Sequence, residues 1–261
     1  MVSVGGFNTP NDNERRGFSF LIFAAIIGFS VARGLATFYT NYLWFGSVEL
    51  RSVWITIFSW RVILIAATSL VAFAFIFVNL RLAVRASPVM DIFDSFDNED
   101  PLLRFRSWVN ERFVRYRILG SIAVSIFLGA GASILWEPTL LYLNQVGFNI
   151  SDPIFNSDIS TYIYGLPLFR QVVAWLMQLV IVSSGIIILY FIATGALQLR
   201  QGRLPSVSSG AKAHLSVLLA FVALLKAASY RLDAYELLYS CLLYTSDAAD
   251  EGLGVDLGGR R

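Results

Sequence analysis

The chain has 261 residues, of which 56% are hydrophobic and only 15% charged, and its mean hydropathy is +0.64. This composition is too apolar for a soluble domain to cover its own surface, so it indicates an exterior that faces a lipid bilayer. The net charge of +2 gives no indication of a nucleic-acid partner. Cys241 is the single cysteine, which excludes an internal disulfide, and no Cys/His cluster has metal-ligand spacing. We therefore expect no metal and no cofactor.

Five apolar runs approach or exceed the roughly 20 residues that a helix needs to cross the hydrocarbon layer. In chain order they cover about residues 18–39, 53–80, 118–136, 172–197 and 215–232, the last being the shortest. The first run is longer than the apolar part of a signal peptide and is expected to be retained. Because unpaired backbone groups cannot be left in hydrocarbon, every run is predicted to be helical. The sequence therefore predicts an all-α fold, a polytopic transmembrane helical bundle of about five spans within residues 17–240.

Basic residues are distributed unevenly between the two sets of connections. One set carries Arg15, Arg16, Arg81, Arg85, Arg104, Arg106, Arg112, Arg115, Arg117, Arg200, Arg203 and Lys212. The other set offers Arg51, Arg170 and Arg231, and residues 137–169 contain no Lys or Arg. Cytoplasmic connections of membrane proteins are enriched in Lys and Arg. We therefore predict a multi-pass protein of the cell membrane with a cytoplasmic N-terminus, residues 1–16.

The connection over residues 86–116 has an acidic first part and a basic, aromatic second part that begins after Pro101. In the second part, apolar side chains recur at helical spacing, at Leu102, Phe105, Val109, Phe113 and Tyr116. Arginines alternate with them, a pattern typical of a helix lying on an anionic leaflet. Anionic lipid headgroups at the cytoplasmic face are the expected partner, and the sequence indicates no particular protein partner.

The last residues differ in character from the rest of the chain. Residues 241–251 resemble the in-frame translation of a transposase-based sequencing adapter, and residues 255–261 resemble that of the matching flow-cell primer. We therefore interpret residues 241–261 as a library artefact and leave them out of the fold prediction. The alternative is a genuine Gly-rich tail.

Several short motifs together resemble one family. They are Tyr42 to Phe45, Asp152 to Phe155 with Asp158 to Ser160, Leu166-Pro167 with Arg170, and Tyr230 to Leu238. Over residues 15–240 the chain resembles uncharacterised protein family 0182, a group of bacterial plasma-membrane proteins. The resemblance implies about seven N-terminal helices followed by a large extracytoplasmic region, and it implies no activity.

Three basic residues, Arg33, Arg61 and Lys226, fall within or near the ends of the apolar runs. A charge there is costly unless it is paired, hydrated or able to reach the interface, so each is a candidate for an intramembrane polar site. Arg33 is the deepest, whereas Arg61 and Lys226 are nearer the outer end and could extend to the interface. The alternative for all three is structural pairing.

Further candidates form a polar cluster on the predicted outer face: Asp152, Asp158, Arg231, Asp233 and Glu236. The carboxylates of the 137–169 connection could bind a divalent cation, but their spacing does not fit the Ca²⁺ loop pattern, and turn formation or helix capping is the stronger interpretation. The residues after Arg231 are expected to form local salt bridges.

His214, the sole histidine, could relay protons but is expected to be incidental. No nucleophile–base pair, phosphate-binding glycine loop or HExxH pattern occurs, so we expect no enzyme. The leading hypothesis is a membrane anchor for a large extracytoplasmic domain with a structural or envelope-associated role. The alternative is a transporter or channel component, in which Arg33 and the face of Gly120, Gly129 and Gly131 would border a pathway. A membrane-embedded transferase is a third hypothesis.

Overall fold

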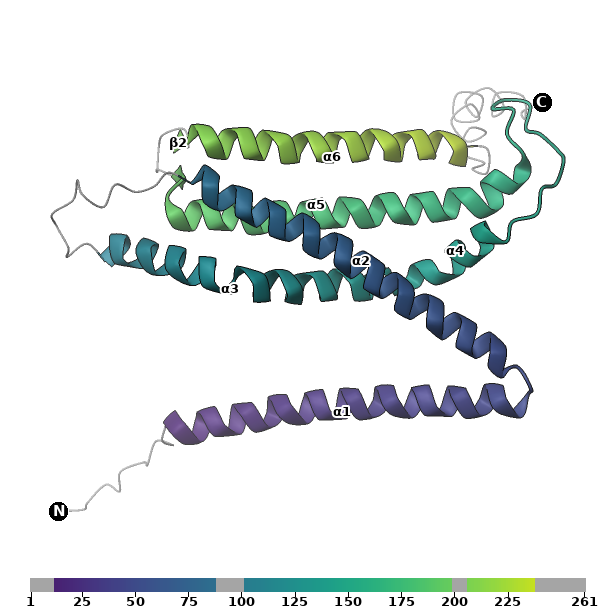
Figure 1. The fold of residues 1–261 in the computed structure, drawn as a ribbon, viewed down its shortest axis with the longest axis horizontal. Coiled ribbons are helices and arrows are strands. Elements are labelled where there is room, and N and C mark those ends of the chain that lie inside the picture. The colour runs from purple at the N-terminus through teal and green to yellow at the C-terminus, as the bar shows by residue number, and fades with distance from the viewer. Residues whose placement is uncertain (1–11, 88–100, 199–205, 238–261) are drawn as a thin grey trace, which may run out of the picture. The chain divides into compact units, whose positions relative to one another are not determined.

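The computed structural model describes residues 12–87, 101–198 and 206–237, and this part of the chain consists of helices, one pair of two-residue strands and the connecting loops (Figure 1). In order, the elements are α1 (Asp12–Ser47), α2 (Arg51–Ala86), α3 (Pro101–Gly131), the 3₁₀ turn η2 (Ala132–Leu135), α4 (Trp136–Leu143), the π-helical turn η3 (Thr161–Gly165), α5 (Leu166–Thr194), β1 (Leu197–Gln198), β2 (Ser206–Val207) and α6 (Ser209–Glu236). The predicted all-α fold is confirmed. The chain divides within α2 into two units, Met1–Ser59 and Trp60–Arg261.

In the first unit, a tight turn joins α1 to the start of α2. The amide of Leu50 donates to the carbonyl of Phe45 at 2.9 Å and closes this turn. Aromatic rings flank it: the centroid of Trp54 lies 4.8 Å from that of Phe38 and 5.3 Å from that of Tyr42. Tyr and Trp are enriched where helices leave the hydrocarbon layer. The aromatic cluster therefore fits a turn at the membrane–water interface, where the first two predicted runs are connected.

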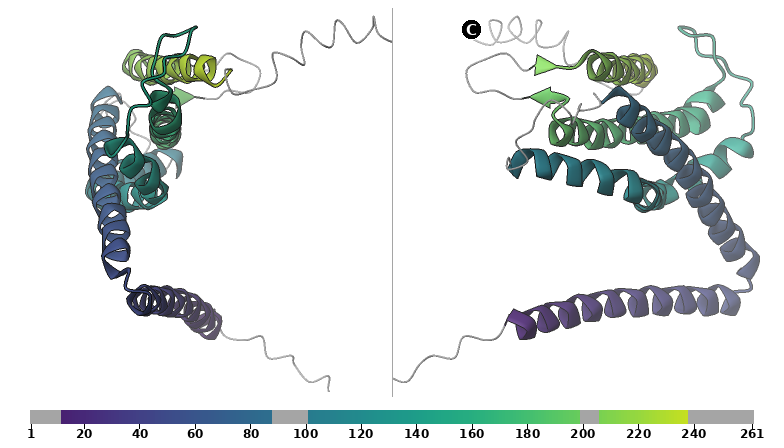
Figure 2. Two further views of the ribbon diagram at one scale, coloured as in Figure 1. Left: turned by 90° about the vertical axis from the view of Figure 1, so that its right-hand side faces the viewer. Right: turned by 60° about the vertical axis from the view of Figure 1, so that its left-hand side comes forward.

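In the second unit, α2, α3, α5 and α6 enclose a common apolar core. Its members are Ala72, Ile76, Leu80 and Ala83 of α2, Leu128 of α3, Leu179, Ile187, Tyr190 and Phe191 of α5, Ala196, and Ala211 and Leu218 of α6. Small residues allow close helix approach: a Cβ on Gly129 would lie only 2.9 Å from the backbone nitrogen of Ser69. α5 and α6 run antiparallel, side by side, and share the most extensive helix contact (Figures 1 and 2).

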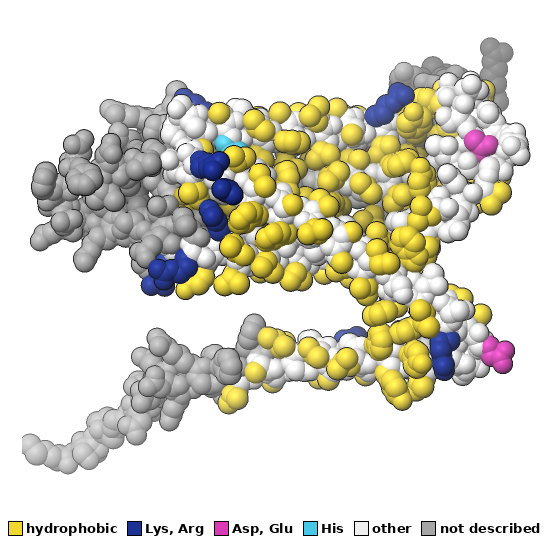
Figure 3. Space-filling model, viewed as in Figure 1, with side chains coloured by type: hydrophobic (Ala, Val, Ile, Leu, Met, Phe, Trp, Pro, Cys, Tyr) yellow, Lys and Arg dark blue, Asp and Glu magenta, His cyan; other side chains and the backbone are white. Residues whose placement is uncertain are grey.

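Four helical stretches in the described residues are long and apolar enough to cross a membrane: Arg51–Ala86, Arg115–Leu143, Thr161–Thr194 and Ser209–Glu236. They expose large apolar side chains, for example Phe127 at 74% and Leu224 at 68% (Figure 3). In water such surfaces would aggregate, whereas lipid solvates them. The four stretches cover the last four predicted runs except for a few residues at the end of 172–197, and they support a multi-pass membrane protein.

The first predicted run, 18–39, lies within α1 but is not among these four stretches, and the side chains of its first residues lie outside the described set. A fifth span therefore stays a prediction. The predicted surface helix over 101–116 forms the first half of α3, continuous with the third run, and its side chains before Arg112 are likewise not described. The acidic residues 91–100 and the tail 241–261 also lie outside the described residues.

Two helix ends differ from the predicted limits. α5 ends at Thr194, because Gly195 adopts a left-handed conformation with a φ of 79°, which ends the helix before residue 197. α6 begins at Ser209, earlier than predicted, where the Ser208 hydroxyl caps the helix by accepting from the amide of Ala211. Backbone conformation determines where α5 ends, and side-chain capping determines where α6 begins. Hydropathy depends on neither of these.

Candidate functional site

The first residue of the site is Arg170, in the first turns of α5. Its guanidinium forms ion pairs with two carboxylates near the end of α6: Nη2 donates to Asp233, and Nη1 lies 2.8 Å from Oε2 of Glu236. Asp233 and Glu236 are three residues apart, so they share one face of the helix. The three side chains are 41% to 42% exposed. A single arginine therefore ties the start of one helix to the end of its antiparallel neighbour.

This arrangement differs from the local salt bridges expected after the fifth run. Arg231 does not pair with Asp233 or Glu236; it donates to the hydroxyl of Tyr235 at 3.1 Å and lies over the same ring. The carboxylates instead reach across to α5 because their helix face packs against that helix. In the sequence, Arg170 is one of the few basic residues of its set of connections, but the sequence did not connect it with Asp233 and Glu236, which are more than sixty residues away.

The loop before η3 packs on the same end of α6. The ring of Tyr235 lies 4.6 Å from that of Phe155 and 6.0 Å from that of Tyr162. The Tyr162 hydroxyl donates to Asp152 at 3.1 Å, and the amide of Phe155 donates to the same carboxylate oxygen at 2.6 Å. Asp152 therefore accepts hydrogen bonds from a turn amide and from an aromatic side chain.

Asp158 caps the start of the next helical segment. Its Oδ1 accepts from the amides of Ser160 at 2.7 Å and Phe148 at 3.2 Å. The hydrogen bond from the Ser160 amide is the main cause that lowers the pKa of this carboxyl below its ordinary value of 3.8. Within the described ranges, no three His, Cys, Asp or Glu side chains come together as metal ligands. The hydrogen bonds of Asp152 and Asp158 fit capping and turn roles.

Of the three basic residues predicted to lie in the apolar runs, Arg33 belongs to the first unit, and Arg61 and Lys226 belong to the second. Arg33 is exposed on α1, and no acidic side chain in the described part of its unit pairs with it. Arg61 of α2 lies 5.2 Å from the centroid of the Trp136 ring. The Lys226 ammonium lies 4.6 Å from the centroid of the Tyr230 ring on α6. Aromatic faces thus accompany Arg61 and Lys226, a favourable setting for a cation in an apolar region.

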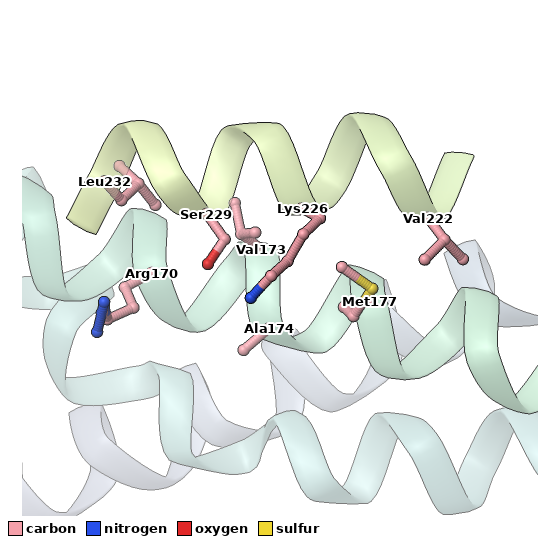
Figure 4. A pocket seen from close by; sticks show the side chains of 8 residues that line it. All are labelled: Arg170, Val173, Ala174, Met177, Val222, Lys226, Ser229 and Leu232. Atoms are coloured by element: carbon pink, nitrogen blue, oxygen red, sulfur yellow. The ribbon is translucent and has the colours of Figure 1, made fainter. Parts of the chain in front are cut away.

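Lys226 and Arg170 share a pocket of about 580 Å³ between α5 and α6 (Figure 4). Its lining consists of Arg170, Val173, Ala174 and Met177 of α5 and Val222, Lys226, Ser229 and Leu232 of α6. In Figure 4 the lysine side chain extends from α6 towards Ala174 on α5. Sequence reasoning missed this pocket because only the antiparallel packing of α5 and α6 brings the two basic residues together.

His214 is buried among the helices of the second unit. Its Nε2 lies 3.1 Å from Oδ1 of Asn79 on α2, whose amide nitrogen donates to the carbonyl of Phe75. The side chain is 9% exposed and packs beside Phe191. The histidine therefore joins α6 to α2 inside the bundle, a packing role that the apolar pattern alone did not indicate.

Comparison with known proteins places the chain in a family. The profile of an uncharacterised protein family, UPF0182, matches residues 18–251. The chain belongs to UPF0182. The match includes residues 241–251, for which an adapter origin stays a prediction. No solved structure matches the chain.

The UPF0182 relatives are much longer than this chain. It is 33% identical to a UPF0182 protein of Nocardia farcinica over 202 residues, which cover 77% of this chain and 20% of that protein. It is 34% identical to one of Mycobacterium tuberculosis over 209 residues, 79% of this chain and 21% of the relative. A relative from Rhodococcus erythropolis is 31% identical over 229 residues, 87% and 23% of the two chains. The chain thus spans about a fifth of the length of the relatives that it matches.

Proposed function

We propose that this region is the N-terminal membrane anchor of a longer UPF0182 protein and that it holds the rest of that protein at the extracytoplasmic face in a structural or envelope-associated role. The observation that carries the proposal is the apolar exterior of four long helices in a chain that spans about a fifth of its relatives' length. Helices of this kind are stable only in a bilayer. The anchor is therefore the part of the protein that this chain supplies.

The roles of the polar residues support an anchor rather than an enzyme. Asp152 and Asp158 are engaged in turn and cap hydrogen bonds, and Asp233 and Glu236 neutralise Arg170. A catalytic acid or base needs a proton-transfer partner in a site that substrate can reach. These carboxylates instead hold helix ends and a loop in place, so we propose no catalytic step for this region.

The experiment that tests the proposal exchanges the anchor. In the full-length gene, the helical region should be replaceable by an unrelated anchor with the same number of spans and the same orientation. We expect the remaining domain to stay attached to the membrane and to restore the envelope phenotype of a deletion strain to near the wild-type level. A domain that is attached and abundant but restores nothing would contradict the anchor role and favour transport through the helices, the alternative that Arg33 and the α5–α6 pocket support.

The orientation is tested separately by cysteine labelling. In a background without other cysteines, a cysteine at Gln145 should react with a membrane-impermeant maleimide in intact cells, and one at Ser209 should react only after the cells are opened. Both positions are exposed and lie at opposite ends of the bundle. The basic side chains near the end of α2 and the start of α6 support this orientation, since Lys and Arg favour the cytoplasmic side (Figure 3). Labelling in the reverse order would overturn the proposed topology.

A further inference from the structure

We propose that the pocket between α5 and α6 binds an anionic phospholipid of the surrounding membrane, with the headgroup phosphate on Lys226 and an acyl chain along the apolar lining. This inference concerns a ligand of the helices themselves and stands whether or not the region serves as an anchor. It rests on the pocket's volume and apolar lining, on a cation without a counter-ion, and on the order of polar and apolar residues along the pocket.

The pocket is suited to a lipid chain in size and lining. Its volume of about 580 Å³ falls within the range of roughly 300–1,000 Å³ typical of small-molecule sites. Five of its eight lining residues are apolar: Val173, Ala174, Met177, Val222 and Leu232. A small polar solute would leave this apolar surface uncovered, whereas an acyl chain would fill it.

The charges in the pocket leave one cation without a counter-ion. The guanidinium of Arg170 is offset by Asp233 and Glu236, although its Nε is buried and has no hydrogen-bond partner. Lys226 contacts the face of Tyr230, but no carboxylate in the described part of the chain pairs with it. An ammonium in an apolar region is costly unless an anion or water compensates it. A lipid phosphate supplies that negative charge.

The residues are ordered along the pocket as a lipid requires. Arg170 and Ser229 lie towards the end of the helix pair, where α5 begins and α6 ends, and Met177 and Val222 lie further into the span (Figure 4). Lys226 lies between them, ten residues before Glu236 and therefore roughly 15 Å from that helix end. Its flexible stem allows the ammonium to reach towards the interface. Phosphate oxygens near the Ser229 hydroxyl and Lys226 would place the acyl chain against Met177 and Val222.

Native mass spectrometry of the purified chain in detergent tests the site, with phosphatidylglycerol, phosphatidylcholine and glycerol phosphate as probes. We expect wild type to retain phosphatidylglycerol, and Lys226→Gln to bind it about tenfold more weakly because a charge-assisted contact is lost. Lys226→Arg should restore most of the binding. Arg61→Gln is the matched control, because it removes a cation that also lies over an aromatic ring but outside the pocket. It should leave binding unchanged.

A second variant separates the pocket from general surface charge. Ala174→Trp fills the pocket and keeps both basic residues, so it should also abolish retention of phosphatidylglycerol. Melting temperatures near that of wild type would show that the variants are folded. Equal retention by wild type, Lys226→Gln and Ala174→Trp would overturn the proposal. Equal affinity for glycerol phosphate and for the lipid would also overturn it, because the site would then recognise only a free phosphate.

Discussion

Replacing Gly129 with valine should destabilise the contact between α2 and α3. A Cβ at this position would collide with the Ser69 side chain and lie 2.9 Å from the Ser69 backbone nitrogen, which cannot move without moving α2. Overpacking of this kind costs about 1–3 kcal/mol, and a valine adds two methyl groups to the collision. We expect the melting temperature of the purified chain in detergent to fall by several degrees or the chain to fail to assemble.

Gly131 supplies the control for this prediction. It lies two residues further along α3, and a Cβ there meets no other atom within 4 Å. Gly131→Val therefore introduces the same side chain on the same helix without the collision. Its melting temperature should stay close to that of wild type. Valine has a higher helix propensity than glycine, so propensity alone would not lower the stability of either variant. If both variants lose the same stability, close packing against Ser69 is not what Gly129 provides.

The helices could be predicted from the sequence because hydropathy acts locally. A run such as 53–80 must be helical in a bilayer whatever it packs against, since its backbone polar groups have no other partners there. The ends of the helices depend on single conformations, such as the left-handed Gly195, and hydropathy did not indicate them. Hydropathy separated the predicted surface helix over 101–116 from the third run, because the residues change there from basic to apolar. Such a change does not by itself interrupt a helix. In the structure α3 continues through this change.

The sites depend on contacts between distant residues and were only partly predictable. The sequence singled out Asp152, Asp233 and Glu236 by their charge near the predicted interface. It did not indicate that Arg170 is the partner of the last two, or that Tyr162 donates to Asp152. His214 was expected to be incidental as a lone histidine, and the sequence did not indicate its contact with Asn79, which lies 135 residues earlier. The sequence indicates which residues are costly in a bilayer, whereas the antiparallel packing of α5 and α6 decides which contacts compensate them.

Replacing Arg170 with glutamine should loosen the end of the bundle where α5 begins and α6 ends. The substitution leaves Asp233 and Glu236 on one helix face without a cation. The loss of the two ion pairs and the repulsion between the two carboxylates then both act against the folded state. Because the side chains are about two-fifths exposed, solvent screens the pairs, and we expect a loss of about 1–2 kcal/mol for the two together. The measurement is the melting temperature of the chain in detergent at low and high salt.

Matched variants identify the cause of this loss. Arg231→Gln removes a neighbouring cation whose contacts are with Tyr235 on its own helix, so its effect should be within about 0.5 kcal/mol of zero. Adding Asp233→Asn and Glu236→Gln to Arg170→Gln should recover much of the stability, because the unpaired carboxylates are then neutral, and the recovery should be larger at low salt. If the triple variant is no more stable than Arg170→Gln alone at either salt concentration, then Arg170 contributes through the packing of its stem beside Val173 and Ala174, and the ion pairs do not hold the two helices together.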